Sequence, residues 1–169
     1  RCLYLGHKPG VRGALTAAEN LQWLLQLDET ACSRKAMLTA LGVTGLAGYE
    51  DTFAGELSAG QTKRIALARL YLPSPPVWLL DEPFAAIDRA GVARLSDRID
   101  SHVADGGTVV FTTHQDVPLR ADIGTKTADH HAHMLMAIAA GKHVLCEKPL
   151  CASVDEARAV VYVRGPAGP

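Results

Sequence analysis

The stretch Leu57–Asp88 constrains the fold of this chain more than any other. It opens with a turn of small and polar residues, Ser58–Gln61, continues in a helical pattern, and reaches the apolar run Val77–Leu80, which the acidic pair Asp81-Glu82 follows. The spacing of 23 residues between the serine of the turn and the first acid accommodates one helix, one turn and one buried strand. A helix followed by such a strand predicts an α/β fold with a parallel sheet, whose ligands bind at the carboxyl ends of its strands.

The turn formed by Ser58, Ala59, Gly60 and Gln61 has the composition of an anion-binding helix start. Small residues allow backbone N–H groups to approach a phosphate, and Ser58 adds a hydroxyl. The first amides of a helix also lie at the positive end of its dipole. The same residues equally fit an ordinary serine N-cap without a ligand.

The carboxylates of Asp81 and Glu82 are the second candidate site. A lone Asp-Glu-Pro tripeptide is a weak signal, but this one ends an apolar run at a defined distance from the turn. Because successive residues of a strand point to opposite faces, we expect the two carboxylates to have different roles.

Four segments in this order resemble the nucleotide-binding subunits of ABC transporters: LSAGQ, VWLLDEP, FAAID and TTH. Further details (YLGHKPG, LTAAENL, TTHQD) resemble most the ATPase subunit of the haem exporter used in cytochrome c maturation. The resemblance covers about residues 1–118. It implies an incomplete P-loop NTPase fold, with a helical subdomain at about residues 16–47.

The resemblance also implies roles for individual residues. Asp81 would hold Mg²⁺, Glu82 would polarise the water that attacks the γ-phosphate of ATP, and His114 would bond that phosphate as the switch histidine. The residues implied to bind the nucleotide are Ser58, Ala59, Gly60, Gln61, Asp88 and His7. The sequence leaves open whether His7 or Lys8 takes the position of the family's Q-loop glutamine, and a plain Pro-Gly turn fits there equally well.

The phosphate loop of this family, G-x-x-x-x-G-K-[ST], does not occur in the sequence. That loop supplies most of the phosphate-binding amides, a lysine and a magnesium-binding hydroxyl. We therefore expect this chain alone neither to bind ATP tightly nor to hydrolyse it. The turn Ser58–Gln61, which resembles the family's signature motif and is called the signature turn below, could still complete the nucleotide site of a second ATPase subunit in a head-to-tail dimer.

Local patterns place the helices of this part. Thr16 with Glu19 forms a capping-box pattern that predicts a helix, and a second helix is expected from about Ser33 to Leu41, closed by Gly42. A further helix should begin at Asp88, and Thr108–Thr112 should be a buried strand. The resemblance implies that the first two helices contact membrane-spanning transporter subunits.

Composition and charge narrow the possible functions. The chain is 48% hydrophobic but only 5% aromatic, which suits the packing of small residues in an α/β fold. Its formal net charge of −1 argues against a nucleic-acid-binding protein. No apolar stretch approaches the roughly 20 residues of a membrane-spanning helix, and no secretory signal is recognisable. We therefore expect a cytoplasmic protein, and the resemblance to transporter subunits implies a peripheral position at the inner face of the membrane. The four cysteines are expected to be reduced, mostly buried thiols.

The remainder, 119–169, resembles a different family. Thr127, His131-Ala132, Gly141-Lys142-His143 and Glu147-Lys148-Pro149 are similar to pieces of the dinucleotide-binding domain of glucose-fructose oxidoreductase-like NAD(P)-dependent dehydrogenases. The resemblance covers about residues 125–160 and implies a Rossmann-like βα piece in which Lys148 would lie by the nicotinamide. Because the glycine-rich dinucleotide loop and the substrate domain are missing from it, we do not expect NAD(P) binding or dehydrogenase activity.

The same remainder can be interpreted without any family. It predicts a helix at about 130–140, a strand at 143–146, a helix at 153–161 and a flexible tail at 164–169. A cluster of possible metal ligands also occurs there, but its spacing fits no closed zinc pattern. These ligands are Asp129, His130, His131, His133, His143, Cys146, Glu147 and Cys151.

Three functions therefore compete. The first is the ATPase subunit of a haem-exporter-like ABC transporter, present as a fragment. The second is a fragment of an NAD(P)-dependent oxidoreductase, and the third is a non-catalytic module that docks on a membrane partner. The junction of two families near residue 120 is consistent with a truncated, rearranged or fused gene.

Overall fold

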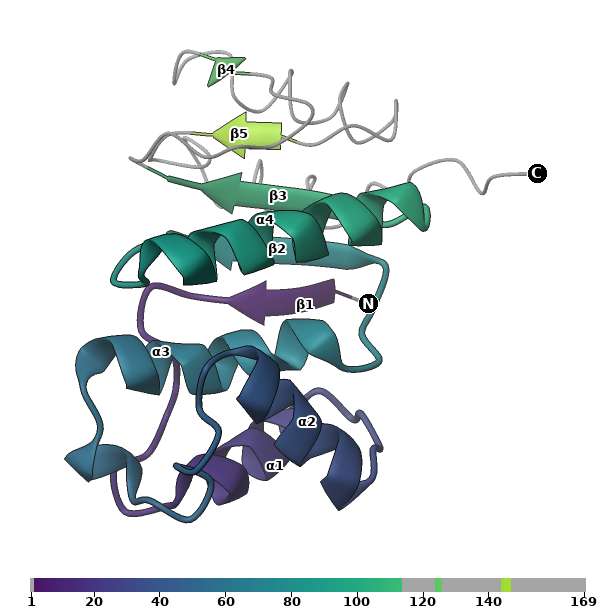
Figure 1. Cartoon of the computed structure of the whole chain (residues 1–169). Helices are drawn as coiled ribbons and strands as arrows, with labels where there is room; N and C mark the ends of the chain where they lie inside the picture. Colours follow the sequence, from purple (N-terminus) through teal and green to yellow (C-terminus); the bar gives the residue numbers. More distant parts are fainter. Residues whose placement is uncertain (1, 114–123, 126–143, 147–169) are drawn as a thin grey trace. The chain divides into compact units, whose positions relative to one another are not determined.

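The computed structural model describes residues 2–113, 124–125 and 144–146, and they form an α/β fold (Figure 1). A five-stranded sheet has the order β1-β2-β3-β5-β4. The chain divides into two compact units: unit 1 comprises residues 1–4, 75–85 and 93–169, and unit 2 comprises residues 5–74 and 86–92.

The strands of the sheet belong almost wholly to unit 1. β2 pairs with β3, β3 with β5 and β4 with β5, each in parallel. The predicted parallel α/β fold is therefore confirmed. The strands are β1 (Cys2–Leu5), β2 (Val77–Asp81), β3 (Thr108–Thr112), β4 (Gly124–Thr125) and β5 (Val144–Cys146).

β3 is buried at every position, as its run of β-branched residues predicts. The register pairs β2 with β3 from Val77 opposite Thr108 to Asp81 opposite Thr112, so the two strands end together. In unit 1, α4 (Arg89–Ala104) contacts β2 through His102, whose ring stacks on Trp78 with the centroids 3.7 Å apart. Arg98 lies over the same indole at 5.1 Å.

Unit 2 is built from helices around its own hydrophobic core. The elements are α1 (Ala17–Leu27), α2 (Arg34–Val43), the short 3-10 helix η1 (Ala54–Glu56), α3 (Ala59–Leu67) and the 3-10 helix η2 (Ala68–Tyr71). α1 packs against α2, α3 and η2, while α2 contacts η2. The core residues include Leu21, Leu25, Leu41, Leu46, Ile65 and Ala68.

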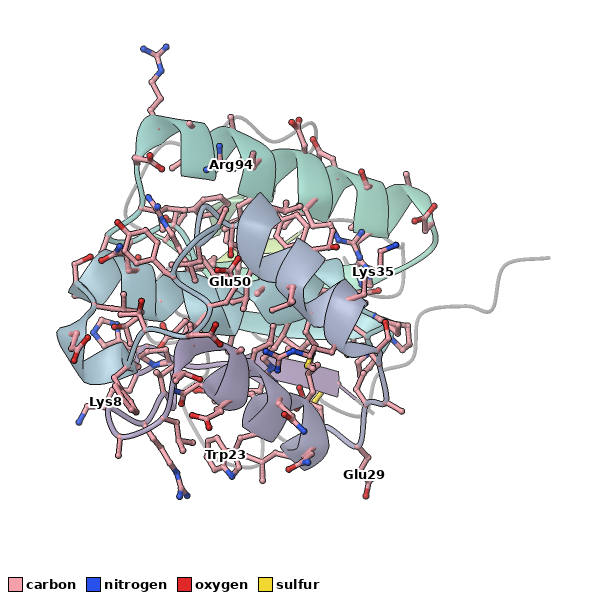
Figure 2. The ribbon with its side chains drawn as sticks, turned by 60° about the horizontal axis from the view of Figure 1, so that its bottom comes forward. Lys8, Trp23, Glu29, Lys35, Glu50 and Arg94 are labelled. Carbon is pink, nitrogen blue, oxygen red and sulfur yellow. The ribbon has the colours of Figure 1, made fainter. Side chains whose placement is uncertain are left out.

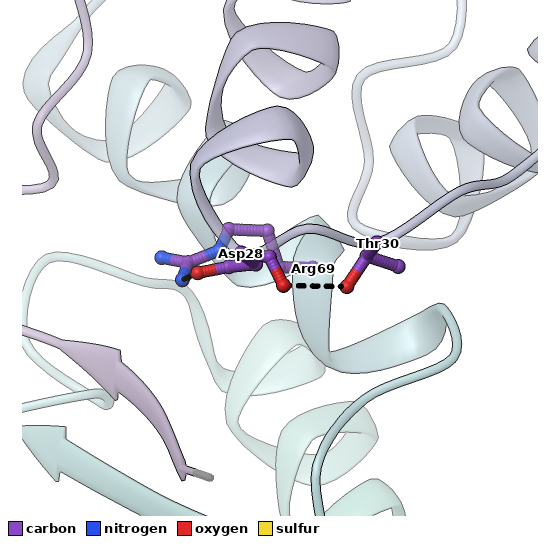
Figure 3. Close-up of polar contacts among 3 residues, drawn as sticks. All are labelled: Asp28, Thr30 and Arg69. Carbon is purple, nitrogen blue, oxygen red and sulfur yellow. Dashed lines mark hydrogen bonds and ion pairs between the residues drawn. The ribbon is translucent and has the colours of Figure 1, made fainter.

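The predicted capping box begins α1. Thr16 accepts a hydrogen bond from the N–H of Glu19, and the carboxylate of Glu19 accepts one from the N–H of Thr16 at 2.8 Å. These bonds lower the pKa of the Glu19 carboxyl, the backbone bond most. At the other end, Asp28 caps the helix and forms a two-pronged ion pair with Arg69 of η2 (Figure 3).

The expectation that Gly42 closes α2 is wrong. The helix runs through Gly42 to Val43, and the glycine with a left-handed backbone is Gly45, with φ of 83°. Gly42 needs no special conformation there, whereas Gly45 takes up the turn that Thr44 begins.

The helix expected from Asp88 is α4, which ends before Gly106, a glycine with φ of 87°. The strand expected at 143–146 is β5 (Val144–Cys146). The two helices and the tail expected at 130–140, 153–161 and 164–169 lie outside the described residues. Cys2 and Cys32 are unbridged thiols and are half-buried, and burial raises the pKa of the Cys32 thiol. Within the part of the chain that is described, no helix is long and apolar enough to cross a membrane.

Candidate functional site

The acidic pair lies at the carboxyl end of β2, in unit 1. Asp81 is the last residue of the strand, whereas Glu82 follows it in a left-handed conformation with φ of 51°. The expectation that both acidic residues stand on one strand is therefore wrong for Glu82. The chain has already turned at this residue, and Glu82 is buried, with 5% of its surface exposed.

Thr112 joins the two acidic residues. Its hydroxyl donates a hydrogen bond to Oδ1 of Asp81 at 2.9 Å and accepts one from the N–H of Glu82 at 3.0 Å. The same N–H also donates to the carbonyl oxygen of Thr112 at 3.1 Å. The end of β3 thereby fixes both the carboxylate of Asp81 and the backbone of Glu82.

The donor chemistry at Asp81 fits magnesium. Mg²⁺ prefers oxygen ligands and is commonly bound through one or two carboxylates, with water and phosphate oxygens completing its shell. Within the described ranges, no three His, Cys, Asp or Glu side chains gather as a metal site. Asp81 therefore suits a cation that takes most of its ligands from water and a nucleotide. It does not suit a cation that needs a closed cage of protein ligands.

The signature turn, Ser58–Gln61, lies in unit 2 at the start of α3. Ser58 Oγ accepts a hydrogen bond from the N–H of Gln61 at 3.2 Å, and Gln61 Oε1 accepts one from the N–H of Ser58 at 3.0 Å. The serine thus acts as a helix cap, as its simpler interpretation predicts. Ser58 and Ala59 are exposed, and the amides of Ala59 and Gly60 belong to the first turn, whose N–H groups have no acceptor within the helix.

The D-loop, Phe84–Asp88, meets the signature turn within unit 2 through its last residues. A Cβ atom on Gly60 would lie 2.6 Å from the carbonyl oxygen of Ala86, so only glycine fits. Asp88 Oδ1 pairs with Arg64 of α3 at 3.1 Å and accepts a hydrogen bond from the N–H of Gly91 at 3.0 Å. Asp88 therefore caps α4 and links it to α3.

The remaining sequence-predicted residues are placed as follows. His7 and Lys8 are both exposed in the turn after β1, and the side chain of Lys8 points away from the ribbon (Figure 2). His114 and Lys148 lie outside the described residues. The possible metal ligands between Asp129 and Cys151 fall almost wholly outside them too, Cys146 being the exception.

Sequence reasoning missed Thr112 and Arg64. A signal for Thr112 was present, because pairing the two apolar runs end to end in parallel places it opposite Asp81. Arg64 had no such signal, since its partner Asp88 lies 24 residues along the chain, beyond a strand of the other unit.

Two protein-family models match the chain. The ABC transporter model matches residues 1–85, and a model of an oxidoreductase family with an NAD-binding Rossmann fold matches residues 92–163. The second match begins within α4. The boundary between the two families near residue 120 stays a prediction.

Curated relatives match the first part of the chain. The cytochrome c biogenesis ATP-binding export protein CcmA of Pseudomonas putida (strain GB-1) is 53% identical over 112 residues, which is 66% of this chain and 53% of that protein. CcmA of Tatumella citrea is 47% identical over 124 residues, 73% of this chain and 58% of that protein. The chain thus spans little more than half the length of these relatives.

Solved structures agree with the fold. The dimeric post-hydrolysis state of the ATP-binding cassette MJ0796 bound to ADP and Pi has a TM-score of 0.59 and 29% identity, over 68% of this chain and 53% of that one. Another dimeric structure of the same bacterial ABC transporter cassette has a TM-score of 0.57 and 28% identity, over 66% of this chain and 51% of that one. The motifs, the parallel sheet and these relatives agree, and the chain therefore belongs to the ABC transporter ATPase family.

Proposed function

We propose that this chain is part of the ATP-binding and ATP-hydrolysing subunit of a haem-exporter-like ABC transporter that acts in cytochrome c biogenesis. The observation that carries the proposal is the arrangement of Asp81 and Glu82 at the carboxyl end of β2, where parallel α/β sheets bind their ligands. The names of the relatives, ATP-binding export proteins of cytochrome c biogenesis, support export in cytochrome c biogenesis as the process served.

Each candidate residue has a chemical part in this proposal. Asp81 offers a carboxylate oxygen to Mg²⁺, which neutralises phosphate charge when it is bound with ATP. Glu82 accepts a hydrogen bond from the attacking water and so orients it toward the γ-phosphate. His114 donates to that phosphate, and His7 or Lys8 stands at the Q-loop position.

In this proposal the signature turn contacts a nucleotide that a second ATPase subunit binds. The helix amides after Ser58 face a phosphate at the positive end of the α3 dipole, while Asp88 holds the D-loop beside them. In a head-to-tail dimer these groups complete the site of a second ATPase subunit. The partners in this proposal are that subunit and the membrane-spanning subunits, which the helices of residues 16–47 contact at the inner face of the membrane.

The proposal is tested by complementation. The probe is the ATPase subunit of the P. putida relative, carrying an intact phosphate loop and an arginine in place of its own signature serine. We expect this chain alone to show no micromolar affinity for Mg-ATP in isothermal titration and no ATP turnover, because its sequence has no phosphate loop. Added to the probe subunit, it should raise the rate of ATP turnover.

The matched control is Ser58→Arg in this chain, which places a bulky side chain at the signature turn and should abolish the rise. Turnover that stays at the level of the probe subunit alone counts against the proposal. Micromolar binding of Mg-ATP by this chain alone would overturn the expected need for a second subunit.

A second candidate function follows from the Rossmann match over residues 92–163. It would place Lys148 beside a nicotinamide. NADPH fluorescence separates this function from the first, since binding to the chain would change the emission of the cofactor. We expect no change, because the glycine-rich dinucleotide loop does not precede the match in the sequence.

A further inference from the structure

The buried hydroxyl of Thr112 occupies a defined place between the two acidic residues. Thr112 is the last residue of β3, lies opposite Asp81 in the parallel register, and has 3% of its surface exposed. Its Oγ1 is 2.9 Å from Oδ1 of Asp81 and 3.0 Å from the backbone nitrogen of Glu82.

The direction of these two bonds follows from the available protons. The N–H of Glu82 is a donor only, so it uses a lone pair of the hydroxyl oxygen. The single hydroxyl proton then points to the carboxylate of Asp81, which when ionised is an acceptor only. A hydrogen bond to an ionised acceptor is stronger than one between neutral groups. The orientation of the Asp81 carboxylate is thereby fixed from β3.

The same hydroxyl supports an unusual backbone. Glu82 has φ of 51°, a conformation that residues other than glycine adopt seldom. Its N–H is shared between the carbonyl oxygen and the hydroxyl oxygen of Thr112, at 3.1 Å and 3.0 Å. Both bonds hold the left-handed turn at Glu82, where the chain leaves the strand.

We propose that Thr112 is a positioning residue for the acidic pair: its hydroxyl holds the Asp81 carboxylate in the orientation that receives the metal and holds the Glu82 backbone in its left-handed turn. This inference rests on the proposed function for the roles of the two acids. The positioning itself rests only on contacts within unit 1.

The test uses the full chain, labelled with ¹³C and ¹⁵N, and three variants. Thr112→Val removes the hydroxyl at nearly constant shape, and Thr112→Ser keeps it. Thr108→Val makes the same change at the opposite end of β3, at a threonine that is also buried (5% exposed) and pairs with Val77. Three-bond couplings report the χ1 rotamer of Asp81, and hydrogen exchange reports the amide of Glu82.

We expect one Asp81 rotamer and a slowly exchanging Glu82 amide in the wild type, in Thr112→Ser and in Thr108→Val. In Thr112→Val the couplings should average and the amide should exchange at least about tenfold faster. An unchanged Asp81 rotamer and unchanged exchange in Thr112→Val would overturn the inference. If the valine disturbs the dispersed amide signals of β2 and β3, Thr112→Ala gives the same comparison without added bulk.

A second readout separates this inference from the proposed function. Mn²⁺ added to the labelled chain should broaden the signals of Asp81 and Glu82, with an affinity that falls about tenfold in Thr112→Val and recovers in Thr112→Ser, as for other residues that orient a metal ligand. If Asp81 keeps one rotamer but Mn²⁺ does not broaden its signals, the metal role is refuted and the positioning role stands. If the wild type and Thr112→Val bind Mn²⁺ with equal affinity, the inference that Thr112 orients Asp81 for the metal is overturned.

Discussion

At the scale of single residues, the close approach of Gly60 to the D-loop decides which side chain the signature turn accepts. A Cβ atom added at Gly60 would lie only 2.6 Å from the carbonyl oxygen of Ala86, which therefore occupies the space of a side chain. Ala86 itself has φ of 61°, so the D-loop is already in a conformation that resists adjustment. The neighbouring position, Ala59, is exposed and already carries a side chain.

Gly60→Ala should therefore destabilise unit 2, although alanine is the better helix former. We expect a loss of about 1–3 kcal/mol in the free energy of unfolding, because the new methyl group meets backbone that cannot move aside cheaply. Urea denaturation followed by circular dichroism measures it.

The matched control is Gly42→Ala, inside α2, where nothing lies within 4 Å of an added Cβ. This change should stabilise the chain by up to about 1 kcal/mol, the difference in helix propensity. Equal effects of the two substitutions would contradict the role assigned to the Ala86 contact.

How far the sequence predicts the site also depends on single residues. Asp81, Ser58 and Asp88 lie at the strand end and helix starts where their patterns place them. The left-handed turn at Glu82 was not predictable, since a strand pattern carries no information on where the chain departs from it. Its stabilisation by Thr112 comes from β3, 30 residues along the chain, and needs the register of the sheet.

At the scale of elements, α1 is tied to η2 by a nearly buried ion pair. Arg69 Nε and Nη2 donate to Asp28 Oδ2 and Oδ1, both at 2.8 Å, and Thr30 donates to the Asp28 carbonyl at 3.4 Å (Figure 3). The side chain of Arg69 is 7% exposed, and that of Asp28 is 19% exposed. Removing one partner of such a pair leaves the other charge without compensation inside the protein.

Asp28→Ala should cost about 3 kcal/mol of unfolding free energy, while the double variant Asp28→Ala/Arg69→Met should recover much of the loss because no buried charge remains. Chemical denaturation of both variants tests this. The control is Asp51→Ala, which removes the exposed pair with Arg34 at 3.8 Å and should change stability by less than about 0.5 kcal/mol. A loss as large in Asp51→Ala as in Asp28→Ala would refute the dependence on burial.

Helix starts were predictable and one helix end was not. Thr16 and Ser33 cap α1 and α2 as their side chains allow, since an N-cap acts within three residues. The end of α2 was misplaced because Gly42 and Gly45 are both available, and packing decides between them. Leu41 and Leu46 lie in the core on either side of the turn, and Gly42 is still inside the helix.

At the scale of the whole molecule, each unit contains one of the two tryptophans. Trp78 is fully buried in unit 1, and Trp23 in unit 2 is half-buried beneath Arg12, 4.2 Å from its ring centroid. Because unit 2 has its own core, we expect Trp23→Phe and Trp78→Phe variants to report different urea midpoints by fluorescence. Coincident transitions would show that the units unfold as one.

The α/β class and its parallel sheet were predictable, because buried strands alternating with helices leave few other arrangements. The division into units was not. The expected helical subdomain covers one continuous range, about 16–47, whereas unit 2 consists of two segments separated by residues 75–85. Only contacts between distant segments, such as Arg64 with Asp88, reveal this.

The interruption of unit 2 has a consequence for how the chain emerges from the ribosome. The helices up to Ser74 are synthesised before the segment Ala86–Val92 that completes the same unit. At roughly 5–20 residues per second, the intervening β2 segment takes about one second to translate. For that interval the nascent helices exist without the Ala86 carbonyl against Gly60 and without Asp88 beside Arg64. The signature turn reaches its final surroundings only after the strand that ends at Asp81 has been made.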